Sequence, residues 1–120
     1  MHKVILDTDF LIHSVENKVD FFSELKKILN FEYKLYILDK TLDELKNKKN
    51  EKLILKMLEK RVQIIETAKD KNVDELVLSL KEDNLIVCTN DKEFKEKLKK
   101  RSIPTINLRQ GKYLVIQNVL

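Results

Sequence analysis

Four carboxylates stand where they could act together on a cation: Asp7, Glu44, Asp74 and Asp91. Asp7 ends the apolar run VIL, Asp91 follows the apolar run LIVC, and the other two lie early in predicted helices. Ligand crevices of open α/β sheets lie beyond the carboxyl ends of the strands, so Asp7 and Asp91 meet there if their strands are neighbours. Clustered carboxylates repel one another unless a cation neutralises them, and oxygen ligands suit Mg²⁺ or Mn²⁺ rather than zinc or copper.

The chemistry that this cluster predicts is phosphodiester cleavage. One or two bound divalent ions can activate water and stabilise the leaving oxygen, so the protein needs few other catalytic groups. An acidic pocket must still attract a polyanion, and we therefore expect lysines at its rim and salt-sensitive binding. Lysines that follow Glu44 and Asp91 in the chain are weaker candidates for this role: Lys46, Lys48, Lys49, Lys52, Lys92 and Lys95.

Each of these residues also has a structural explanation. Asp7 or Thr8 can cap the next helix, and Asp74 and Asp91 suit the first turn of a helix because they favour its dipole. Glu44 can pair with Lys48 four residues on. The lysine runs are equally typical of solvated helix faces, so spacing alone leaves both interpretations open.

The elements that must position the carboxylates are strands alternating with helices. Short apolar runs predict strands over 4–7, 34–38, 61–65, 84–88 and 103–108, with one more over 112–116 left open. Apolar residues at helical spacing predict helices over 18–29, 39–48, 53–60, 72–83 and 90–101. Asp39 or Thr41 is the expected cap of the second of these helices, and Asn90 with Glu93 forms a capping-box pattern before the last. This alternation predicts a mostly parallel sheet with helices on both faces.

Size and composition set further bounds. A chain of 120 residues with 42% hydrophobic residues is expected to form one domain over residues 1–120. Its apolar runs are far shorter than the roughly 20 residues of a membrane span, so we expect a soluble, cytoplasmic protein with no membrane partner. Cys88, the one cysteine, lies in an apolar run and is expected in the core, which excludes a disulfide framework. The net charge of +4 is compatible with a nucleic-acid partner without establishing one.

The segments around the four carboxylates resemble the PIN-domain family of metal-dependent ribonucleases, including its VapC-like and small archaeal members. The resemblance rests on VILDTDFLI, TLDELK, NVDELVLSL and IVCTNDKEF, in that order, and on the tail IPTINLRQGKYL. It implies an α/β/α fold with a five-stranded sheet in the order 3-2-1-4-5, and a homodimer that acts on RNA. It further implies that Asp7, Glu44, Asp74 and Asp91 bind Mg²⁺ or Mn²⁺, with Thr8, Thr89 and Asn90 as orienting groups.

Part of this assignment of site residues depends on the alignment of the motifs alone. Asp9 stands where the family often has Asn or Ser, and the choice of Glu44 over Asp43 and of Asp74 over Glu75 rests on matching the motifs.

Other functions remain as alternatives. The DTD motif resembles the Asp-x-Asp of haloacid-dehalogenase-type phosphatases, although the paired acids that such enzymes need later in the chain are missing from TND. A receiver-like signalling domain fits less well, because the fifth strand leads into NLRQ rather than to a lysine. A PIN fold that only binds RNA or assembles with partners is the non-enzymatic alternative. Within the ribonuclease interpretation, the roles are the toxin of a toxin–antitoxin pair, with a small antitoxin as partner, or an RNA-processing nuclease.

Overall fold

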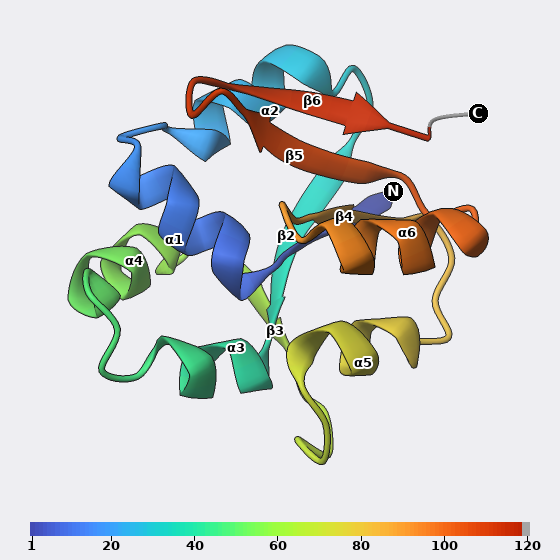
Figure 1. The fold of residues 1–120 in the computed structure, drawn as a ribbon, viewed down its shortest axis with the longest axis horizontal. Helices are drawn as coiled ribbons and strands as arrows, with labels where there is room; N and C mark the ends of the chain where they lie inside the picture. Colours follow the sequence, from blue (N-terminus) through green and yellow to red (C-terminus); the bar gives the residue numbers. More distant parts are fainter. Residues whose placement is uncertain (119–120) are drawn as a thin grey trace.

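The computed structural model describes residues 1–118 and shows strands and helices in near-regular alternation (Figure 1). In chain order the elements are β1 His2–Leu6, α1 Thr8–Glu16, α2 Phe21–Ile28, β2 Tyr33–Leu38, α3 Asp39–Leu45, α4 Glu51–Leu58, β3 Gln63–Ile65, α5 Val73–Leu78, β4 Leu85–Cys88, α6 Lys92–Lys100, β5 Thr105–Arg109 and β6 Tyr113–Gln117. Within the described part of the chain, no helix combines the length and the apolar character needed to cross a membrane.

The strands form a single sheet in the order β3-β2-β1-β4-β5-β6. The first five strands of this order pair in parallel, as predicted, and β6 extends the sheet by pairing antiparallel with β5. The predicted order of five strands is therefore confirmed, and β6, the strand that the sequence left open, brings the sheet to six strands within residues 1–118. Because β1 and β4 are neighbours, with Leu6 opposite Cys88, the residues that follow them meet at one edge of the sheet.

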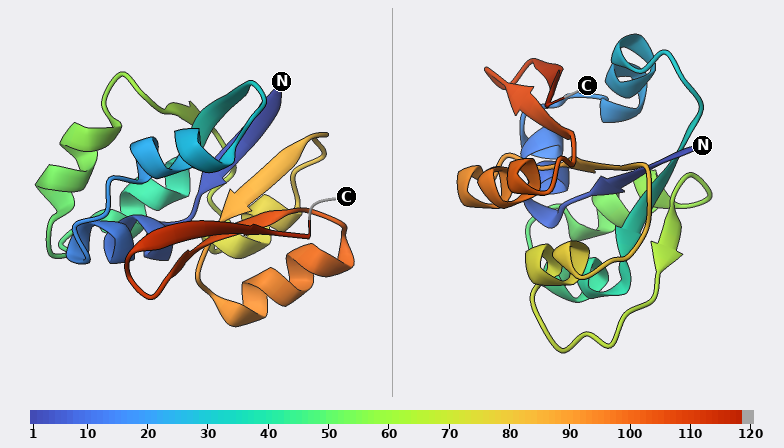
Figure 2. Two further views of the ribbon diagram at one scale, coloured as in Figure 1. Left: turned by 90° about the horizontal axis from the view of Figure 1, so that it is seen from above. Right: turned by 90° about the vertical axis from the view of Figure 1, so that its right-hand side faces the viewer.

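Helices cover both faces of the sheet, and each face has its own apolar core. Successive residues of a strand point to opposite faces, so Val4 and Leu6 pack with α1, α2, α3 and α4, while Ile5 packs with α5 and α6. Figure 1 shows α1 and α4 on one side of the sheet and α5 and α6 on the other, and Figure 2 gives two further views of the same arrangement. The continuous apolar run of β1 is thus explained by burial on both faces. Cys88 is fully buried in the first core, as predicted.

Two helix boundaries and one helix cap differ from the prediction. The helix expected over 18–29 begins only at Phe21, because Asp20 is its N-cap and accepts a hydrogen bond from the Ser23 backbone N–H. The helix expected over 72–83 ends at Leu78. Neither Asp39 nor Thr41 caps α3: its N-cap is Leu38, and the Asp39 carboxylate instead accepts hydrogen bonds from the backbone N–H and the hydroxyl of Thr67.

The β5–β6 hairpin packs its turn against the end of α1 through Gly111, the one glycine of the chain. Gly111 has φ +63°, and a Cβ at this position would lie 2.6 Å from Asn17 Oδ1. We expect Gly111→Ala to lower the free energy of unfolding by at least roughly 1–2 kcal/mol, since the left-handed conformation alone costs about that much. Denaturant unfolding measures the change.

The matched control for Gly111→Ala is the same substitution in an Asn17→Ala background. Removing the Asn17 side chain relieves the close contact and leaves only the backbone cost, so the loss of stability there should be smaller. Equal losses in the two backgrounds would show that the contact with Asn17 contributes nothing.

Candidate active site

A cavity of about 400 Å³ opens at the carboxyl edge of the sheet, beyond the ends of β1 and β4. It brings together the four predicted carboxylates, which reach it from four segments: the residue after β1, helix α3, the first turn of α5 and the N-cap of α6. The residues that line this acidic cavity are Asp7, Thr8, Asp9, Ile12, Glu44, Lys48, Asp74 and Asp91. Carboxylates far apart in the sequence therefore converge because the parallel sheet aligns the strand ends.

Asp7 is the most buried of these carboxylates, with 7% of its surface exposed. The pKa of Asp7 is raised to about 7, mainly by burial and in addition by the negative charges of Asp9 and Asp74. Hydrogen bonds from the Thr89 hydroxyl and the Thr8 backbone N–H oppose this rise. Ionisation of Asp7 thus costs free energy in the metal-free protein. A bound cation would offset this cost, so the site favours cation binding.

Thr89 joins Asp7 to Asp91. Its hydroxyl donates to Asp7 Oδ2 at 2.8 Å and accepts from the Asp91 backbone N–H at 3.1 Å. The residue is fully buried directly after β4. The contact holds the Asp7 carboxylate in place, which is what the predicted orienting role of Thr89 requires.

Substitution of Thr89 tests this role. We expect Thr89→Val to lower kcat for the reaction at this site about tenfold, because the lost bond to a buried carboxylate is worth roughly 1–3 kcal/mol. The hydrogen bond from Thr89 lowers the pKa of Asp7, so its loss should raise that pKa. The acid limb of the pH–rate profile should therefore move to higher pH. Thr89→Ser keeps the hydroxyl and should restore both properties, whereas a purely steric role would leave the pH profile of Thr89→Val unchanged.

Asp91 combines a structural contact with a place in the acidic cavity. It is the N-cap of α6, and its Oδ1 accepts the Phe94 backbone N–H at 3.1 Å. The second oxygen has no hydrogen-bond partner among residues 1–118. The predicted capping box at Asn90 and Glu93 is wrong, because the Asn90 amide pairs with both backbone groups of Leu108 and so fastens the end of β4 to β5. Asn90 does not line the acidic cavity, in contrast to Thr8.

Glu44 is held by Thr8, whose hydroxyl donates to Glu44 Oε1 at 2.5 Å. No ion pair joins Glu44 to Lys48 within the part of the chain that the structure describes, although both residues line the cavity. The neighbouring acid Asp43 points elsewhere and forms an ion pair with Lys69 at 3.5 Å. The structure therefore places Glu44, not Asp43, on the acidic cavity.

The remaining acids of the cavity come from the first turns of two helices. Asn72 caps α5 by accepting the Glu75 backbone N–H, and this places Asp74 on the cavity while Glu75 is exposed away from it. Asp9, in the first turn of α1, also lines the cavity. The motif comparison did not assign Asp9 to the site; its spacing of two residues from Asp7 was the available signal.

Of the lysines predicted to rim the site, only Lys48 is among the lining residues. Lys46, Lys49, Lys52 and Lys92 are exposed and Lys95 is half-buried, without lining the cavity. The cavity thus carries five carboxylates against a single ammonium group, a strong local excess of negative charge.

The donors present fit a hard divalent cation. All of the candidate ligands are oxygens, and the buried Asp7 carboxylate lies beside two other carboxylates that repel it. As placed, no three His, Cys, Asp or Glu side chains among residues 1–118 converge closely enough to enclose an ion. Mg²⁺ does not require such a cage, because it keeps several waters and takes only one or two carboxylates together with substrate phosphate oxygens.

Known proteins resemble this chain over almost its full length. A protein-family profile described as "PIN like domain" matches residues 4–111. Ribonuclease VapC4 of Methanocaldococcus jannaschii is 36% identical over 132 aligned positions, which cover 97% of this chain and 97% of that protein. The solved structure of the PIN domain endonuclease Utp24 superposes with a TM-score of 0.86, covering 98% of this chain and 92% of that one. Its 23% identity makes it a likeness of fold.

Proposed function

The chain belongs to the PIN-like domain family, and from this premise we propose that it is a metal-dependent endoribonuclease that hydrolyses RNA phosphodiester bonds in the acidic cavity. The observation that carries the proposal is the convergence of Asp7, Glu44, Asp74 and Asp91 on one cavity. The relative named as a ribonuclease supports RNA as the substrate. The phosphatase and receiver alternatives have no comparable support.

In this proposal the side chains divide the work between holding an ion and orienting the ligands. Asp7, Glu44, Asp74 and Asp91 would hold Mg²⁺ or Mn²⁺, one or two of them directly and the others through metal-bound waters. The ion when bound supplies Lewis acidity toward the phosphate and lowers the pKa of water. Thr89 holds Asp7, and Thr8 holds Glu44, so the carboxylates lose little freedom when a ligand binds. Asp7 must be ionised to bind the ion, so metal binding releases any proton that the Asp7 carboxyl group carries.

In this proposal Lys48 meets the incoming phosphate, and its support is that Lys48 is the one cation that lines the acidic cavity among the described residues. We expect Lys48→Gln to raise KM for RNA severalfold, with a smaller effect on kcat, and to reduce the salt dependence of binding by about one phosphate contact. The matched control is Lys49→Gln, which removes the same charge from an exposed neighbour outside the cavity. Equal effects of the two substitutions would show that Lys48 contributes only to the overall positive charge and makes no specific phosphate contact.

The biological role that we propose is the toxin of a toxin–antitoxin pair, as the likeness to a VapC protein suggests. The partners would be RNA, a small antitoxin and a second copy of the chain in a homodimer. An RNA-processing nuclease is the alternative role. Expression of this protein alone, and together with the product of the neighbouring gene, tests the toxin proposal. Growth arrest that the neighbouring gene product relieves would support the toxin role. Expression of the active enzyme without growth arrest would favour the RNA-processing role.

The experiment for the activity itself is cleavage of a mixed pool of labelled single-stranded and hairpin RNAs. We expect cutting with Mg²⁺ or Mn²⁺ and none with EDTA. Well-folded protein that binds these RNAs without metal and never cuts them would contradict the enzyme proposal and favour a silent RNA-binding module.

A further inference from the structure

A second and larger hollow, of about 1030 Å³, lies at the opposite edge of the sheet from the acidic cavity. It is bounded by the start of β2, helix α2, and the turn between α4 and β3, and Met1 before β1 lies at its side. Strand β1 separates the two sites: Met1 lines the hollow, and Asp7, after five strand residues, lines the acidic cavity. At about 3.3 Å per residue the two sites are roughly 16 Å or more apart.

The charge of this basic hollow is opposite to that of the acidic cavity. Four cationic residues line it, against the two acidic residues Asp20 and Glu32. Asp20 already accepts hydrogen bonds from the backbone N–H and the hydroxyl of Ser23. No ion pair within residues 1–118 engages any of the four cations, which are Lys26, Lys34, Lys60 and Arg61.

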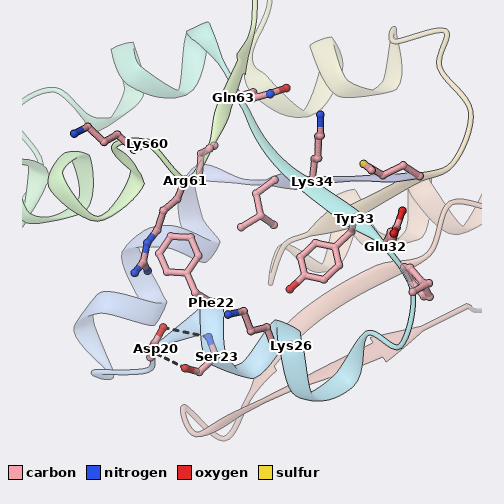
Figure 3. A pocket seen from close by; sticks show the side chains of 14 residues that line it. Asp20, Phe22, Ser23, Lys26, Glu32, Tyr33, Lys34, Lys60, Arg61 and Gln63 are labelled. Atoms are coloured by element: carbon pink, nitrogen blue, oxygen red, sulfur yellow. Dashed lines mark hydrogen bonds between the residues drawn. The ribbon is translucent and has the colours of Figure 1, made fainter.

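Aromatic surface accompanies the positive charge. The Arg61 guanidinium lies over the Phe22 ring, 4.6 Å from its centroid. Figure 3 shows the Arg61 guanidinium beside Phe22, with the Tyr33 hydroxyl and the Lys26 ammonium directed into the space next to them. Lys34 and Lys60 extend outward from the hollow in the same view. Tyr33 is half-buried, so one part of its ring packs on the core while its hydroxyl reaches the hollow.

This combination suits a single-stranded nucleic acid. Proteins that bind single strands combine a cationic groove for the backbone with aromatic rings or arginine planes on which bases stack. An acidic peptide would use the cations but would have no need for a flat guanidinium held in place by a ring. The acidic cavity carries five carboxylates and one lysine, so RNA affinity must come from elsewhere on the surface.

We propose that the basic hollow is a second RNA-binding site, which holds a single-stranded segment of the substrate away from the bond that is cut. This inference rests on the proposed function, because it takes RNA as the substrate. RNA long enough to reach both edges of the sheet binds through the hollow, while a very short RNA reaches only the acidic cavity. The hollow therefore contributes to KM for long substrates and not to the chemical step.

The test measures binding of fluorescein-labelled single-stranded RNA to the full chain in EDTA, followed by cleavage of long and very short RNAs in Mg²⁺. The variant is Lys26→Gln with Arg61→Gln. The matched control is Lys97→Gln with Lys100→Gln, which removes the same charge from exposed positions on α6. Because Arg61 also packs on Phe22, Lys26→Gln alone provides a second variant, which leaves this contact intact and removes a cation directed into the hollow.

We expect Lys26→Gln with Arg61→Gln to bind long RNA at least about tenfold more weakly than wild type, with a shallower salt dependence. Lys26→Gln alone should weaken binding by less than the double variant but by more than the control, which should change less than about twofold. Cleavage of the very short RNA should stay at the wild-type rate. Equal weakening in variant and control, or an equal loss of cleavage for short and long RNA, would overturn the inference. Preferential binding of a polyglutamate peptide at these residues, without an effect on RNA, would do the same.

These results are separate from those that test the proposed function. If wild type binds RNA through the hollow but never cuts it, the second RNA-binding site stands and the ribonuclease proposal fails. If wild type cuts RNA and the hollow variants bind it normally, the ribonuclease proposal stands and the second site fails.

Discussion

Asp7→Asn is expected to lower metal-dependent RNA cleavage by at least roughly 100- to 1,000-fold, the range seen when one preorganised group that stabilises charge in the transition state is lost. Asp7 is the most buried carboxylate of the cavity and touches both Thr89 and the backbone of Thr8. The amide keeps the shape of the side chain but removes its charge and one of its two anionic oxygens. Single-turnover cleavage with saturating enzyme measures the chemical step directly.

The matched control for this substitution is Asp70→Asn, which makes the same chemical change at an exposed position before α5 and outside the acidic cavity. We expect it to retain wild-type cleavage. Substantial activity in a folded Asp7→Asn protein would contradict the assignment of Asp7 as a metal ligand, whatever the control does.

The second large effect concerns the stability of the metal-free protein. The pKa of Asp7 is raised from an ordinary value of 3.8 to about 7, so the folded state binds more protons than the unfolded state between these pH values. The stability that this proton contributes is present below pH 3.8 and is lost as the pH rises through about 7. From pH 5 to pH 8 we expect the free energy of unfolding to fall by on the order of 2 kcal/mol through this group.

Three comparisons isolate the contribution of Asp7. Asp20 and Asp39, whose pKa values are lowered mainly by hydrogen bonds from backbone N–H groups, lose their stabilising effect only on acidification below the usual carboxyl range. Asp7→Asn should lack the decline between pH 5 and pH 8 and should be more stable than metal-free wild type at pH 8. Saturating Mg²⁺ should remove the decline in wild type, and a flat wild-type profile in EDTA would refute the raised pKa.

Local sequence patterns predict the fold well where a residue's partner is close in the chain or where burial is continuous. The apolar runs ending at Leu6 and Cys88 predict strands because these strands are buried on both faces, and the parallel order follows from the helices between them. The sequence leaves the antiparallel strand β6 open, since its run of half-buried residues has no pattern that fixes its partner.

The two wrong predictions of helix caps share one physical cause, which is that the side chains have partners distant in sequence. Asp39 looks like a helix cap but bonds Thr67, 28 positions away, and Asn90 looks like the start of a capping box but bonds the backbone of Leu108. Such contacts depend on which loops the fold brings together. The presence of Asp9 on the cavity could have been inferred from its two-residue spacing from Asp7, whereas the exclusion of Asp43 required the position of Lys69.

The most direct test of the central claim, that these carboxylates hold a divalent ion, is the anomalous difference map of a crystal grown with Mn²⁺. The account predicts one or two peaks in the acidic cavity, with carboxylate oxygens of Asp7 and of at least one of Glu44, Asp74 or Asp91 at roughly 2.0–2.2 Å. An empty acidic cavity at saturating Mn²⁺, or an ion bound only elsewhere on the chain, would contradict it.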